Sequence, residues 1–280
     1  MKSLKEALLN RPKNIDVARM AAEEYINDNY IVAGKLTFEN VNNMCFVNCD
    51  GDVKVGNQKI VKLTNGFVWG KIKKDFYCVG CKDLESLEGA PKEVGGDFYC
   101  SYCTKLKSLE GAPEKVGGIF GCFDCPGLKT LEGAPEYVGG DFNCYNCRNL
   151  ESLEGASKEV GGNFQCVGCI KLESLEGAPE IVDKKFDCSW CHGLKTLKGA
   201  PEEVGGDFYC SYCKDLKSLE GAPEKVSKDF SCSNCESLIS LQGAPKEVGE
   251  SFICFGCKNL KTLEGAPKKV RKIDCDSRLK

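Results

Sequence analysis

Histidine is nearly absent from this chain of 280 residues, in which His192 stands alone. It directly follows Cys191 in a segment that reads as a turn, so we expect an exposed residue rather than a catalytic base. A Cys–His pair for nucleophilic catalysis would require one cysteine placed differently from its equivalents, and the sequence gives no such sign. The Gly-Gly pairs lack the Lys-Ser/Thr of a phosphate-binding loop. These absences predict no catalytic residues and no cofactor, and hence a protein that is not an enzyme.

Excess positive charge and long apolar runs are also missing. The chain has 38 Lys and Arg against 41 Asp and Glu, so it lacks the basic stripe that a nucleic acid or an anionic membrane would require. No run of about 20 apolar residues could span a bilayer, and the N-terminal segment has no apolar region of signal-peptide length. We expect a soluble, cytoplasmic protein without nucleic-acid or membrane partners, with a host cell or a virion as the alternative location.

Cysteine, by contrast, is abundant, with 21 residues. Without an export signal we expect these to be thiols or metal ligands rather than disulfides. Nine of them recur every 22 residues, and each is followed by a second cysteine three residues on. The first members of the pairs are Cys78, Cys100, Cys122, Cys144, Cys166, Cys188, Cys210, Cys232 and Cys254. A period of this length, held over nine copies without an insertion, is typical of a solenoid.

Residues 94–115, VGGDFYCSYCTKLKSLEGAPEK, represent the repeat unit. The segment from Phe98 to Cys100 has the alternating pattern of a short strand with two inward side chains. The Glu-Gly-Ala-Pro segment has proline in eight of nine copies, with Ser157 in the other, and together with the Gly-Gly pairs it disfavours a helix on the return path. The sequence predicts a β-rich solenoid with one short parallel strand per repeat. The return side should be extended, polyproline-like or a brief 3₁₀ turn.

The segments outside the array read as caps on the open ends of the solenoid. We expect a helical cap over residues 1–30. A capping box at Ser3–Glu6 predicts one helix to Asn10, and an N-cap at Asn14 predicts a second helix to about residue 27. Nine repeats should span 72–269, and residues 270–280 should supply a final strand, at Val270–Cys275, and a polar end.

Residues 31–71 are expected to form a β cap that includes one degenerate repeat. In this alignment Asp50–Val55 matches Gly95–Cys100. Strand-like runs between turn signals occur at 30–32, 35–38, 53–55, 59–63 and 67–69. Cys45 and Cys49 belong to no regular pair.

The unit Phe98-x-Cys100-x-x-Cys103-x-x-Leu106-x-x-Leu109 resembles the core of a leucine-rich repeat, and in particular its cysteine-containing subclass. The segment Leu109–Val116 is similar to the short, proline-bearing convex side of bacterial effector repeats, and similar repeat-only proteins occur in phages and host-associated bacteria. This resemblance implies a right-handed coil whose concave sheet face binds proteins. Phe and Cys stand where leucines are usual in the strand, and no further domain follows the array, so the ligase activity of some effectors is not expected.

The paired cysteines allow three interpretations. Their spacing, C-x2-C-x18-C-x2-C, fits a zinc ribbon, but strands about 4.8 Å apart would crowd such sites, and nine pairs cannot divide into four-cysteine sites. Disulfides between stacked cysteines are disfavoured by parallel Cβ vectors. We favour a cysteine ladder without metal, in which the first cysteine is a buried apolar residue and the second bonds to backbone groups of the turn.

Side chains beside the inward Phe and Cys should point outward from the sheet, and they vary between repeats. The candidate partner-binding residues are Tyr77, Tyr99, Phe123, Tyr145, Asp187, Tyr209, Ile253 and Phe255. Aspartate precedes the phenylalanine in five copies, at Asp75, Asp97, Asp141, Asp207 and Asp229. These aspartates either cap the preceding Gly-Gly turn or dock a basic surface. The tyrosines either pack across strands or provide binding area.

The leading hypothesis is a non-enzymatic scaffold that binds a protein partner on its sheet face. The first alternative is a structural or assembly component, such as a virion or surface element that self-associates end to end. The second alternative is a zinc-binding protein that uses the CxxC pairs.

Overall fold

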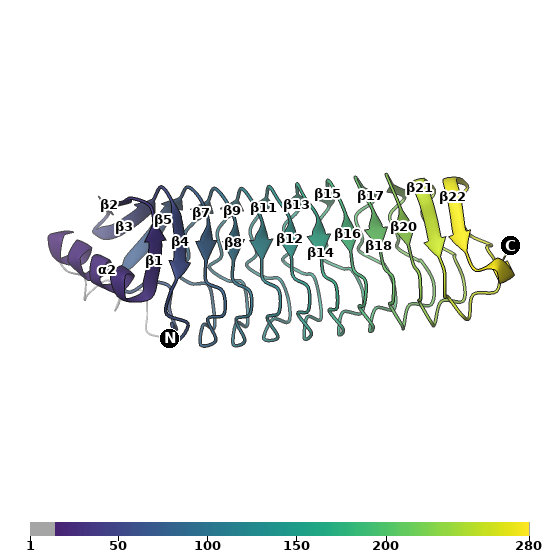
Figure 1. Ribbon diagram of the computed structural model, residues 1–280, viewed down its shortest axis with the longest axis horizontal. Helices are drawn as coiled ribbons and strands as arrows, with labels where there is room; N and C mark the ends of the chain where they lie inside the picture. The colour runs from purple at the N-terminus through teal and green to yellow at the C-terminus, as the bar shows by residue number, and fades with distance from the viewer. Residues whose placement is uncertain (1–14, 280) are drawn as a thin grey trace.

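The computed structural model describes residues 15–279, which form a β-solenoid. Figure 1 shows the coils in a single row, with helix α2 and the β2–β3 hairpin at one end and strand β22 at the other. The predicted helix at Ser3–Asn10 and the N-cap at Asn14 lie outside the described residues.

Helix α2 (Ile15–Asn29) covers the first coil, as expected for the second predicted helix. It buries Ala22 and Ile26 against the core, and the Tyr25 hydroxyl donates to the Lys62 carbonyl at 2.7 Å. The strands that follow are β1 (Tyr30–Ala33), β2 (Leu36–Val41), β3 (Met44–Cys49), β4 (Asp52–Val55) and β5 (Phe67–Ile72). The pairs β1–β4 and β2–β3 are antiparallel, whereas β3 pairs with β5 in parallel.

The degenerate repeat is confirmed by strand register, because Val53 of β4 pairs with Phe76 and Lys54 pairs with Tyr77. The strand predicted at 59–63 was wrong. This segment is irregular, and it buries Ile60 and Leu63, which are three residues apart like the return-side leucines of the regular repeats. A spacing of three does not fit the two-residue alternation of a strand.

Each regular repeat contains the predicted Phe-x strand and, just before it, a second short strand. In the representative repeat these are β7 (Glu93–Val94) and β8 (Phe98–Tyr99). The others are β6 (Phe76–Tyr77), β9 (Lys115–Val116), β10 (Phe120–Gly121), β11 (Tyr137–Val138), β12 (Phe142–Asn143), β13 (Glu159–Val160), β14 (Phe164–Gln165), β15 (Ile181–Val182), β16 (Phe186–Asp187), β17 (Glu203–Val204), β18 (Phe208–Tyr209), β19 (Lys225–Val226) and β20 (Phe230–Ser231). All pair in parallel with the equivalent strand of the next repeat, so every phenylalanine lies beside a phenylalanine. The two strands fuse in β21 (Glu247–Cys254).

The core is a stack of identical layers. Nine buried phenylalanines form one column, with ring centroids 5.1–5.6 Å apart. They are Phe76, Phe98, Phe120, Phe142, Phe164, Phe186, Phe208, Phe230 and Phe252. Both cysteines of every pair are also fully buried. The inward direction predicted for the Phe-x-Cys strand is therefore confirmed.

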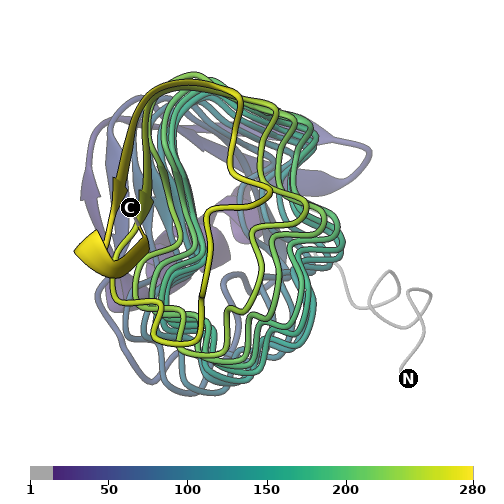
Figure 2. The same ribbon diagram turned by 90° about the vertical axis from the view of Figure 1, so that its right-hand side faces the viewer.

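The return side of each coil, which carries the Glu-Gly-Ala-Pro segment, has no helix. It is also hydrogen-bonded from coil to coil, for example from Leu109 N to Glu132 O at 3.0 Å. A tight turn closes where Ala112 N donates to Leu109 O at 2.9 Å. Gly111 adopts φ 87° there, and a side chain would collide with the backbone of Glu88. Because both sides of the coil repeat through backbone hydrogen bonds, successive coils lie almost over one another along the axis, as the teal-to-yellow coils of Figure 2 show. The coils follow one another in a straight row, so the sheet face does not curve along the solenoid axis into the expected concave surface (Figure 1).

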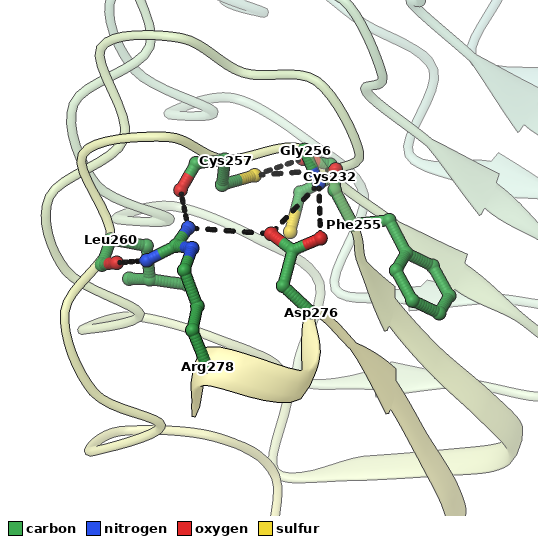
Figure 3. Close-up of polar contacts among 7 residues, drawn as sticks. All are labelled: Cys232, Phe255, Gly256, Cys257, Leu260, Asp276 and Arg278. Atoms are coloured by element: carbon green, nitrogen blue, oxygen red, sulfur yellow. Dashed lines mark hydrogen bonds and ion pairs between the residues drawn. The ribbon is translucent and has the colours of Figure 1, made fainter. Parts of the chain in front are cut away.

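The last coil is closed by strand β22 (Lys269–Cys275) and the short 3₁₀ helix η1 (Ser277–Leu279). The predicted strand at Val270–Cys275 is confirmed. This segment is one residue shorter than in the regular repeats, and a register shift against β21 between Val248 and Ser251 accommodates the difference. Figure 3 shows how side chains replace the next coil: the Asp276 carboxylate accepts from Gly256 N at 3.1 Å. The Arg278 guanidinium donates to the carbonyls of Cys257 and Leu260, each at 2.6 Å.

Candidate partner-binding site

The sheet face is defined here by three outward positions per repeat: the residue before the core phenylalanine, the residue after it, and the residue after the first cysteine. Tyr99 is half-buried on this face, whereas its neighbours Phe98 and Cys100 are fully buried. Serine hydroxyls at two of these positions meet between adjacent repeats, at 2.8 Å from Ser211 to Ser231. These positions therefore share one side of the sheet, as alternation predicts.

Four of the eight predicted binding residues lie together. Tyr77 stacks on Tyr99 with ring centroids 5.7 Å apart, and Tyr99 meets the edge of Phe123 at 6.3 Å. Phe123 stacks on Tyr145 at 4.5 Å and meets Tyr102 edge-on at 5.3 Å. We call these five residues the aromatic patch. It extends over four consecutive repeats, and such clustered aromatic area is typical of binding hot spots.

Tyr102 was not among the predicted residues. It occupies the turn position between the two cysteines, and 48% of its surface is exposed. Its φ of 60° lies in the left-handed region, which is costly for a large side chain. Six of the nine repeats place Gly, Asn or Asp at this position, and the other aromatic residues there are Trp190 and Tyr212. An aromatic residue where the other repeats carry turn formers was the sequence signal that could have identified it.

A glycine and a buried serine lie next to the aromatic patch. Gly121 stands where a side chain would collide with the Tyr99 ring, so this ring lies directly over the neighbouring strand. Ser101 is fully buried, and its Oγ is the one buried side-chain oxygen or nitrogen in residues 15–279 without a hydrogen-bond partner. The equivalent Ser211 bonds to Ser231, but Gly121 offers Ser101 no such hydroxyl.

The aspartates before the phenylalanines form a ladder. The Asp75 Oδ1 accepts from Asp97 N at 2.8 Å, and the Asp97 Oδ1 accepts from Ile119 N at 2.7 Å. The expected cap on the preceding Gly-Gly turn was therefore wrong: each carboxylate reaches forward to the same position of the next repeat. Parallel stacking in register brings these positions within reach, which one repeat alone cannot reveal. Asn163 has the same role, accepting from Lys185 N at 3.1 Å.

The other predicted residues lie elsewhere on the face. Asp187 is close to Tyr209, and Lys185 lies beside both: its Nζ is 3.3 Å from the Asp187 Oδ2 and 5.8 Å from the centre of the Tyr209 ring. Desolvation, with the charges of Asp207 and Asp229, raises the pKa of Tyr209 to about 12. Ile253 and Phe255 lie near the C-terminal end, and 45% of Phe255 is exposed.

The only histidine has a structural contact. Trp190 stacks on Tyr212 at 4.1 Å in the turn row. The His192 ring lies beside Trp190, and its Nδ1 donates to the Tyr212 carbonyl at 2.9 Å. His192 is half-exposed rather than fully exposed, because it packs against this pair.

The cysteines form the predicted ladder. In eight repeats the second cysteine donates from Sγ to the carbonyl of the first cysteine one repeat earlier, at 3.1–3.3 Å. Burial raises the pKa of Cys100 and of Cys210 well above the usual value, and raises that of Cys235 to about 12. In contrast, a hydrogen bond from a neighbouring cysteine lowers the pKa of Cys103 and of Cys257. All 21 cysteines are free, and residues 15–279 contain no group of three or more His, Cys, Asp or Glu side chains arranged to hold a metal.

Comparison with known proteins gives no family for this chain: no family model, curated protein or solved structure matches it. In the part of the chain that the structure describes, no helix has the length and apolar character to cross a membrane.

Proposed function

We propose that this protein is a non-enzymatic scaffold that binds a protein partner on its sheet face. The observation that carries the proposal is the aromatic patch, which combines rings from four repeats on a rigid, uniform framework. The core layers beneath the patch hardly vary from repeat to repeat, so core packing does not explain why the outer side chains differ. Variable aromatic positions on an invariant array suit recognition of one partner.

We also propose that the repeats belong with the cysteine-containing leucine-rich repeats. Support comes from the 22-residue period, the inward Phe-x-Cys strand and the second cysteine bonded to the backbone of the previous coil. The return side, which is short and not helical, agrees with the proline-bearing repeats that the sequence resembles.

The assembly alternative receives less support. End-to-end self-association requires an open coil at each end, but helix α2 covers the first coil, and Asp276 and Arg278 bond to the last one. The edge strand β22 also carries Lys269, Arg271 and Lys272, and such charges discourage pairing with another edge.

A peptide-display selection tests the proposed function. Peptides enriched on the protein would be measured against a Tyr99→Ser, Phe123→Ser variant, which uses residues that this chain itself carries at equivalent positions. The control is Tyr137→Glu on the return side, where Tyr137 is 44% exposed and other repeats have Glu. We expect the face variant to weaken binding about tenfold or more and the control to leave it unchanged. Enriched peptides that bind the face variant normally would refute the sheet face as the site.

A further inference from the structure

We propose that the segment bound at the aromatic patch presents arginine side chains, so that the partner is a protein with an arginine-bearing docking segment. This rests on the proposed function and specifies its ligand. The evidence comes from the distribution of charge, from a lysine that the face already holds, and from a buried hydroxyl in the patch that has no hydrogen-bond partner.

Charge is segregated between the faces of the solenoid. The sheet-face positions of the nine repeats contain six aspartates and one lysine, a net charge of −5, although the whole chain carries only −3. On the remaining surface, lysines pair with acidic residues one repeat away, as in Lys107–Glu85 and Lys246–Glu224. Among the described residues, the aspartates of the ladder have no ion-pair partner, so their negative charge is available to a cationic ligand.

Lys185 provides an internal example of how this face holds a cation. It replaces the usual aspartate, and its ammonium group lies 3.3 Å from the Asp187 carboxylate and 5.8 Å from the centre of the Tyr209 ring. Around the aromatic patch the same groups are present without a cation. There, Asp75 and Asp97 lie on successive rungs, and the Tyr77 hydroxyl donates to the Asp75 Oδ2 at 2.7 Å. Stacked like charges destabilise a sheet, and a bound cation would relieve this repulsion.

The patch has one further unused feature. Ser101 Oγ, buried on the outer side of the sheet between Tyr99 and Tyr102, has no partner. It can accept a hydrogen bond from a donor that enters among these rings.

Arginine fits these features better than lysine. A planar guanidinium stacks on tyrosine and phenylalanine faces and can still donate in its plane to carboxylate and hydroxyl oxygens. An ammonium group has no planar face to stack. The site offers both rings and acceptors, which is the combination that guanidinium uses.

The test is direct titration of a synthetic peptide with four arginines separated by Gly-Ser, against matched peptides in which lysine or uncharged citrulline replaces arginine. Calorimetry should give the order arginine, then lysine, with citrulline weakest. Asp75→Asn with Asp97→Asn should weaken the arginine peptide about tenfold, because charge is lost while the ladder hydrogen bonds remain, as Asn163 shows. The matched control is Asp207→Asn with Asp229→Asn, which makes the same two changes on distant successive rungs.

A second pair of variants tests the rings. Tyr102→Asn introduces a residue that other repeats carry at this turn position, and it should weaken arginine binding about fivefold. Tyr212→Asn makes the same change outside the patch and should have no effect. Thermal unfolding of each variant shows whether the fold is retained.

Equal binding of the arginine and citrulline peptides would overturn the inference. An effect of the Asp207/Asp229 variant as large as that of the Asp75/Asp97 variant would also overturn it, because it would indicate nonspecific attraction. If display-selected peptides without arginine still depend on Tyr99 and Phe123, the arginine inference fails while the proposed function stands. If no selected peptide depends on those residues, both fail.

Discussion

Neighbouring residues of one strand should differ sharply in their contribution to stability, and Phe98 and Tyr99 offer the cleanest comparison. Phe98 is fully buried, with the rings of Phe76 and Phe120 stacked 5.6 Å away on either side. Phe98→Ala removes a core ring and leaves a cavity between two layers, which costs about 3–5 kcal/mol. Tyr99 is half-buried and has two aromatic neighbours on the outer face, each worth about 0.2–1 kcal/mol. Tyr99→Ala should therefore cost only about 1 kcal/mol.

Guanidinium chloride unfolding followed by circular dichroism measures both free energies of unfolding. Repeat arrays can open in parts, so native-state hydrogen exchange should also be followed at Phe98 N and Phe120 N, which bond to the carbonyls of Ile119 and Asp141. Phe98→Ala should accelerate exchange in the adjacent layers, whereas Tyr99→Ala should not. Equal losses of stability for the two variants would contradict the assignment of inner and outer faces.

Three further outcomes are expected. Cys147→Ala should lower the free energy of unfolding by about 1–3 kcal/mol, because the buried Cys122 carbonyl loses the hydrogen bond from the Cys147 thiol at 3.2 Å. Cys147→Ser should lower it less, since a hydroxyl can donate in place of the thiol. Chemical denaturation compares the two variants, and equal losses would contradict the cysteine ladder. Asp229→Asn should stay within about 0.5 kcal/mol of the parent while Asp229→Ala costs about 1–2 kcal/mol, since only the asparagine can still accept from Ser251 N. An equal loss of melting temperature in the two variants would speak against the aspartate ladder. The pKa of Tyr209 is raised, so folding favours its protonated phenol, and the free energy of unfolding should fall as pH rises from about 10 to about 12. This fall should be smaller in Tyr209→Phe. Identical pH profiles for the two proteins would rule out a contribution from Tyr209.

Most of the fold followed from periodicity. A 22-residue repeat without insertions forces equivalent residues into equivalent layers, so the buried roles of Phe98, Cys100 and Cys103 could be predicted from one unit. The degenerate match at Asp50–Val55 and the final strand at Val270–Cys275 were predicted because their patterns still match the unit. The region from 59 to 63 was misread because its apolar composition resembles a strand, although its side chains follow the return-side spacing.

Part of the candidate site could also be predicted from the sequence. Alternation along the strand identified Tyr77, Tyr99, Phe123 and Tyr145 as outward residues. It could not show that they meet, because contacts between repeats depend on register and on which way each ring leans. Tyr99 leans over Gly121, for instance, and this brings it to Phe123.

The sequence by itself determined the repeating layers, the direction of the core side chains and the identity of the variable outer positions, since these depend on local pattern alone. Only the tertiary structure decided which residues act between layers. Stacking in register produces the aspartate ladder, the bond from the second cysteine to the coil before it, and the straight row of coils. The unpartnered Ser101 hydroxyl is also a tertiary feature, because it lacks a partner only where the neighbouring repeat carries Gly121 instead of serine.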